Sequence, residues 1–192
     1  MSARAAPVEQ TADRAGAVAA VVVVAVGSIL LALRPLSEVT ADTRVVLFGA
    51  TYLTVGIASM AVPVARDRPH LPPVMALGLG LAAILLAARV VGPSVPSPWS
   101  AAALPLLLLA AVAEEALFRR VAYARLEQLG AVVAIAGSAL LFGLVHVPAY
   151  GIAALPVDVG AGLLLGWQRW ASGTWTVPAA THAFANAVVV LR

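Results

Sequence analysis

Long apolar stretches alternate along the chain with short polar or Pro/Gly-rich breaks. A bilayer has a hydrocarbon core about 30 Å thick, and a helix needs roughly 20 apolar residues to cross it. Seven stretches have approximately this length, although proline interrupts the last two: 15–33, 45–65, 72–91, 101–128, 131–147, 152–170 and 174–191. The pattern therefore predicts an all-α fold, a polytopic transmembrane bundle of about seven helices.

The breaks indicate how the chain is organised. The first 14 residues, MSARAAPVEQTADR, are polar, and we expect residues 1–14 to form a disordered N-terminal tail. The proline-rich segment 92–100 is expected to connect two helices instead of continuing one. Residues 15–192 are then a single transmembrane domain, in which 101–192 carries the polar motifs described below.

Composition supports the membrane assignment and excludes several function classes. The chain is 62% hydrophobic and 11% charged, with a mean hydropathy of +0.98, whereas soluble domains are about half apolar and a quarter charged. Cysteine is absent, which excludes a disulfide scaffold, a thiolate nucleophile and cysteine-ligated metal centres. The 12 basic residues are scattered between apolar stretches and form no block for a phosphate backbone, which argues against nucleic-acid binding. We expect an integral, multi-pass protein of a prokaryotic plasma membrane.

Two glutamates and an arginine interrupt the fourth apolar stretch. An ionised side chain at mid-bilayer costs at least ~2.5–3.5 kcal/mol, so such residues usually face the protein interior or a wet cavity. Glu115 and Arg119 lie four positions apart on one helix face, with the acid first, which suits an internal ion pair. Glu114 is rotated from Glu115 by about 100° and points elsewhere. We therefore expect Glu114 to be the carboxylate that does chemistry, unless the helix emerges into water at this point.

Two further apolar stretches carry polar residues at helical spacing. Each holds a pair of residues four positions apart on one face: Phe142 and His146, and His182 and Asn186. Taken singly, a histidine here is also compatible with an interfacial or satisfied core position, and a His–Asn pair with hydrogen bonds between helices.

Helix arithmetic tests whether these residues share one depth. If Gly130 is the turn of a helical hairpin, Glu114 and His146 each lie 16 residues from it, roughly 24 Å along their helices. From the turn before the last helix, His182 lies about 14 Å away and Asn186 about 20 Å. We therefore expect Glu114, His146 and Asn186 to converge in one layer, with His182 one turn away.

In this order on successive apolar helices, the three patterns resemble the motifs of a known family. EExxxR at 114–119, FxxxH at 142–146 and HxxxN at 182–186 are similar to those of the CPBP family, also called Abi. This family comprises the CAAX prenyl endopeptidase and bacteriocin-processing-like intramembrane proteases. The resemblance covers about 101–192 and implies hydrolysis of a peptide bond inside the membrane.

The resemblance also implies a role for each motif residue. Glu114 and His146 would activate a water molecule, and His182 and Asn186 would stabilise the tetrahedral oxyanion. A supporting shell would comprise Glu115, Arg119 and Phe142. The family has been described both as a metalloprotease and as a glutamate protease, and Glu114, His146 and His182 could form a zinc site. Because the chain has no HExxH motif, we favour a mechanism with no cofactor over one with zinc.

The implied substrate is a membrane-bound or prenylated peptide, reached among the membrane lipids. Two other functions remain open on the sequence alone. The first is a non-catalytic membrane protein, an immunity or scaffold factor in which the polar residues only hold the bundle together. The second is a small transporter, because acids and histidines at mid-membrane also mark ion paths. It ranks lower because residues 15–91 and 101–191 show no convincing internal repeat.

Overall fold

The computed structural model describes residues 7–33, 40–65, 67–91 and 101–191, and every regular element in these ranges is helical. The long helices are α1 (Pro7–Leu33), α2 (Ala41–Ala61), α3 (Pro73–Val91), α4 (Leu104–Glu115), α6 (Ala131–Tyr150), α7 (Leu155–Ser172) and α8 (Thr176–Val190). A π-helix, η3 (Ala116–Ala122), joins α4 to the short α5 (Tyr123–Leu126), so that α4, η3 and α5 form one rod. Single 3₁₀ turns flank these elements: η2 (Ala101–Ala103), η4 (Glu127–Leu129) and η5 (Ile152–Ala154). The predicted all-α bundle of about seven helices is confirmed.

The first helix starts earlier than the polar pattern suggested. It begins at Pro7 instead of near residue 15, because proline has the backbone angle of a helix and no N–H to leave unpaired in the first turn. Residues 7–14 of the expected tail are therefore helical, and residues 1–6 lie outside the described residues. The expected connection at 92–100 lies outside them as well.

Within the described ranges, five helical segments are long and apolar enough to cross a bilayer: Arg14–Leu33, Asp42–Ala61, Pro73–Val90, Ala101–Leu129 and Ala131–Tyr150. The final helix, Thr176–Val190, is apolar but shorter. Large apolar side chains are exposed on the outer helices, for example Ile57 at 69% and Val90 at 78%, where a bilayer would cover them. The protein is an integral, multi-pass membrane protein.

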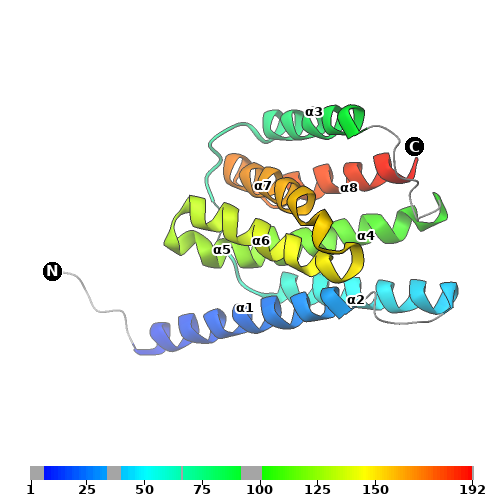
Figure 1. Ribbon diagram of the computed structural model, residues 1–192. Helices are drawn as coiled ribbons and strands as arrows, with labels where there is room; N and C mark the ends of the chain where they lie inside the picture. Colours follow the sequence, from blue (N-terminus) through cyan, green and yellow to red (C-terminus); the bar gives the residue numbers. More distant parts are fainter. Residues whose placement is uncertain (1–6, 34–39, 66, 92–100, 192) are drawn as a thin grey trace.

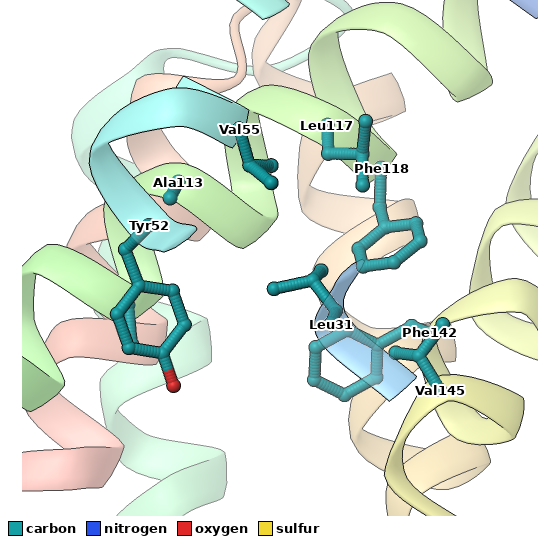
Figure 2. Packing of buried hydrophobic residues seen from close by; sticks show 9 residues of the cluster. Leu31, Tyr52, Val55, Ala113, Leu117, Phe118, Phe142 and Val145 are labelled. Carbon is teal, nitrogen blue, oxygen red and sulfur yellow. The ribbon is translucent and has the colours of Figure 1, made fainter. Parts of the chain in front are cut away.

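The helices lie in layers, with the motif-bearing helices inside (Figure 1). Helices α1 and α2 cover one side of the bundle and α3 the opposite side, and α4, α6, α7 and α8 lie between them. Figure 2 shows the apolar core where α1 and α2 meet the rod and α6, and Leu31 and Phe118 are among its fully buried members. This packing fixes the rod from one side and leaves its other side facing α7 and α8.

Helices α6 and α7 approach each other closely because Gly162 has no side chain. A Cβ atom at Gly162 would lie 2.8 Å from the Cα atom of Ala139, too close for any real contact. The hairpin before α6 turns at Gly130, whose φ of 109° favours glycine. The structure thus confirms Gly130 as the turn on which the depth arithmetic depended.

Candidate active site

The site begins where the rod changes from α- to π-helix, directly after Glu114 and Glu115. In η3 the N–H of Tyr123 donates to the carbonyl of Phe118, five residues earlier. The Arg119 carbonyl, four residues earlier, does not receive this N–H and instead accepts a 3.1 Å hydrogen bond from Nε of Arg169 on α7. Short π-helical segments frequently occur at functional sites, and here the segment anchors the rod to α7.

Glu115 is the centre of a buried polar cluster. Its Oε1 atom accepts hydrogen bonds of 2.9 Å from Nη1 of Arg119 and 2.9 Å from Nδ1 of His182. Arg119 is fully buried, and its Nη2 atom donates to the carbonyl of Gly162 at 3.0 Å. The internal Glu115–Arg119 pair expected from the spacing is confirmed. Through this cluster, one carboxylate and one guanidinium join the rod to both α7 and α8.

Glu114 lies beside His146, as the depth arithmetic predicted. Oε2 of Glu114 is 3.7 Å from Nε2 of His146, and the two residues are 3% and 8% exposed. Nδ1 of His146 is 2.7 Å from the carbonyl of Phe142. Because a carbonyl only accepts, Nδ1 must carry the proton, and Nε2 is then the atom that faces Glu114.

Phe142 forms the aromatic wall between the two clusters. Its ring centroid lies 4.6 Å from that of His146 and 5.5 Å from that of His182. Cζ of Arg119 also lies 4.6 Å from the centroid of the Phe142 ring, within the range of a cation–π contact. Phe142 therefore holds both imidazoles and the guanidinium at fixed separations.

The two polar residues of α8 lie at depths that differ from the arithmetic. His182 contacts Glu115 directly, whereas Nδ2 of Asn186 donates to the carbonyl of Leu107 at 3.0 Å. Leu107 lies eight residues before Glu115, about 12 Å along an α-helix. The arithmetic assumed a uniform α-helical rise and parallel axes, whereas the chain between Glu115 and Gly130 contains π and 3₁₀ segments. His182 is consequently in the carboxylate layer, with Asn186 one turn further along α8.

His146, His182 and Asn186 line one cavity of about 350 Å³. Most of its remaining wall is apolar, including Leu107, Leu164 and Val189. Polar side chains of two motifs thus line a single space large enough for part of a substrate, and Glu114 of the third motif contacts His146 without lining that space.

Sequence reasoning missed one acid at this cavity, Asp158 near the start of α7. Asp158 lines the cavity and interacts electrostatically with both His146 and Glu114. Its Oδ2 atom is buried and has no hydrogen-bond partner within the described part of the chain. The sequence did indicate this residue, because Asp158 is the sole acid in the apolar stretch 152–170. The cost of an ionised side chain inside the membrane, which pointed to Glu114, applies equally to Asp158.

The described side chains do not match the zinc site considered from the sequence. In the ranges that the structure covers, no three His, Asp or Glu residues group closely enough to hold a metal ion. Nδ1 of His182 is bound to Glu115, so only its Nε2 atom could take part in such a set. No step of the chemistry proposed below passes through a metal.

Buried carboxylates and imidazoles at one cavity inside a bundle of apolar helices define a membrane protein with an internal polar site. Comparison with known families specifies the class further. Residues 96–188 match the family described as Type II CAAX prenyl endopeptidase Rce1-like, which confirms the resemblance to CPBP proteases. The matched residues include all three motifs, and the match supports a CAAX-type intramembrane protease. No curated protein and no solved structure matches the chain significantly.

Proposed function

We propose that this protein hydrolyses a peptide bond of a membrane-associated or lipidated peptide, with water activated by Glu114 and His146. The observation that carries the proposal is the approach of Glu114 Oε2 to His146 Nε2, 3.7 Å, with both side chains buried. This separation exceeds a direct hydrogen bond and suits a water molecule that donates to both atoms.

The reaction follows from these two acceptors. Glu114 takes a proton from the water molecule while the water oxygen attacks the carbonyl carbon of the substrate peptide bond, and a tetrahedral oxyanion forms. Protonated Glu114 then transfers that proton to the amide nitrogen as the C–N bond breaks, which yields a carboxylic acid and an amine. His146 keeps its Nδ1 proton on the Phe142 carbonyl, so its Nε2 atom orients the water throughout.

His182 and Asn186 are suited to the oxyanion. Glu115 binds Nδ1 of His182, so a protonated imidazole would donate from Nε2. A carboxamide nitrogen carries two hydrogens, and Asn186 uses one of them on Leu107. A donor of this kind contributes a factor of about 10²–10³ to the rate when it is aimed at developing charge.

The cavity suits an apolar or lipidated substrate segment. Its polar lining comes from the motif residues and Asp158, and aliphatic side chains form most of the rest. Such a wall binds apolar groups by burying their surface, whereas the few polar groups fix their orientation. A plasma-membrane location in a prokaryote is part of this proposal.

Glu114→Gln tests the mechanism, because it keeps the shape of the side chain and removes its basicity. We expect the purified variant to cleave a reporter peptide about 10²–10⁴-fold more slowly, with unchanged helical circular dichroism. Glu127→Gln is the matched control, since it makes the same change in the 3₁₀ turn η4 that follows the rod, away from the cavity, and should leave the rate unchanged. Near wild-type cleavage by Glu114→Gln would contradict the mechanism, whereas no cleavage by the wild-type protein would favour a scaffold role.

A chelator tests the metal-independent form of the proposal. Wild-type protein treated with a strong chelator should keep its cleavage rate. Loss of activity that zinc restores would show that the reaction needs a metal and would overturn this part of the proposal.

A further inference from the structure

A second cavity, about 580 Å³, opens where α2 ends and α8 begins. It shares no lining residue with the cavity at His146. Its polar lining consists of two arginines, one aspartate and three hydroxyl side chains: Arg120, Arg169, Asp67, Ser172, Thr174 and Thr176. The proposed peptidase mechanism uses none of them.

The charges at this cavity favour an anion. Arg169 is 3% exposed, and it donates from Nε to the Arg119 carbonyl and pairs through Nη2 with Asp67. Its Nη1 atom is buried and has no hydrogen-bond partner in the described ranges. Arg120 donates to the carbonyl of Ser59. Because a carbonyl carries no net charge, this contact does not neutralise the guanidinium. The lining itself holds two guanidinium groups and one carboxylate, and a second carboxylate, Glu127, interacts with Asp67 and Arg169 from outside the lining. Guanidinium binds phosphate oxygens strongly.

An apolar groove of about 300 Å³ adjoins this cavity between α2 and α4. Met60 and Trp175 line both spaces, so that the two adjoin at these side chains. Along the groove, Leu53, Ile57 and Val112 are 52%, 69% and 45% exposed. Leu53 lies seven residues before Met60, about 10 Å along the helix, so the groove leads from the helix ends toward mid-membrane.

We propose that the cavity and the groove together bind one anionic glycerophospholipid. The phosphate lies against Arg120 and Arg169, and an acyl chain follows the groove between α2 and α4. A lipid fits better than a soluble anion because an apolar groove adjoins the charged cavity. Trp175 at the junction has the amphipathic ring that suits the boundary between headgroups and acyl chains.

Fluorescence quenching by brominated lipids tests this site without any assay of peptide cleavage. Replacing Trp99, Trp167 and Trp170 by Phe leaves Trp175 as the sole tryptophan of the chain. This protein is reconstituted in phosphatidylcholine vesicles that contain phosphatidylglycerol, with acyl-chain bromines on one lipid or the other. We expect phosphatidylglycerol to quench Trp175 at several-fold lower mole fraction than phosphatidylcholine does.

Two variants separate the headgroup from the acyl chain. Arg120→Gln should weaken the preference for phosphatidylglycerol roughly fivefold, as expected for one arginine at a membrane surface, whereas the matched Arg125→Gln should leave it unchanged. Val112→Phe fills the groove from a half-exposed position and should reduce quenching by both lipids.

Equal quenching by the two lipids in the wild-type background would overturn the proposal. If Arg125→Gln lost as much preference for phosphatidylglycerol as Arg120→Gln, the proposal would also be overturned, because the preference would then reflect the total charge of the protein. Displacement of the lipid by millimolar inorganic phosphate, with no effect of Val112→Phe, would identify a site for a soluble anion instead.

Discussion

Replacing Arg119 should separate the two helices that its guanidinium connects. Arg119 is fully buried, binds Oε1 of Glu115 from Nη1 and binds the Gly162 carbonyl from Nη2. In Arg119→Ala both contacts are lost and the Glu115 carboxylate stays buried, with His182 as its remaining donor. In Arg119→Lys the charge is retained, but a single ammonium cannot reproduce the planar fork that reaches both acceptors.

The structure gives a magnitude for each variant. Removing one partner of a buried ion pair costs about 3–5 kcal/mol, and a hydrogen bond from a charged donor contributes about 1.5–3 kcal/mol. Because one guanidinium makes both contacts and His182 still binds Glu115, the two losses overlap. We expect Arg119→Ala to lower the free energy of unfolding by about 3–5 kcal/mol and Arg119→Lys by about 1.5–3 kcal/mol.

Reversible unfolding in mixed dodecyl maltoside and SDS micelles, followed by circular dichroism, measures these differences. Arg89→Ala is the control, because Arg89 is exposed in the last turn of α3, and it should change stability by less than about 0.5 kcal/mol. If Arg119→Ala lost less than about 1 kcal/mol, or if Lys were no better than Ala, the assigned role of the guanidinium would be wrong.

Two further predictions concern α7 and α8. Gly162→Ala would place a Cβ atom 2.8 Å from the Cα atom of Ala139 and should lower the free energy of unfolding in the same assay by about 1–3 kcal/mol. Gly160→Ala, with nothing within 4 Å of its Cβ position, is its control and should not destabilise the bundle. His182→Ala should lower kcat for peptide cleavage by about 10²–10³-fold with a smaller change in KM, and an unchanged kcat would exclude His182 as an oxyanion donor.

Helical periodicity and the cost of buried charge were sufficient to predict part of the site from the sequence. Glu115 and Arg119 share one helix, so their pairing depends only on local geometry. Glu114 and His146 lie on two helices joined by one tight turn, so their common depth needs only one further assumption, the turn at Gly130. Because the sequence separations are short and only one hairpin is involved, errors in the predicted depth of these side chains stayed small.

Contacts set by packing between distant helices could not be predicted in the same way. Whether His182 or Asn186 meets the carboxylate layer depends on how α8 crosses the rod and on the π-helical segment within it. The bond from Arg169 to the Arg119 carbonyl exists because that segment changes the backbone pairing. No spacing within either helix indicates such a change.

One part of the cavity wall comes from α3, a helix that carries none of the three motifs. Among the lining residues that the structure describes, Ile84 and Val189 lie outside the family-matched segment, and Ile84 is the one that α3 contributes. The motif residues on α8 also fasten that helix to the rod, through Glu115 and the Leu107 carbonyl, so reshaping the cavity from that side would loosen its scaffold. Ile84 makes no contact of this kind. On the proposed function, a substitution at Ile84 could therefore change the selectivity of the cavity for a substrate side chain without loosening the attachment of α8 to the rod.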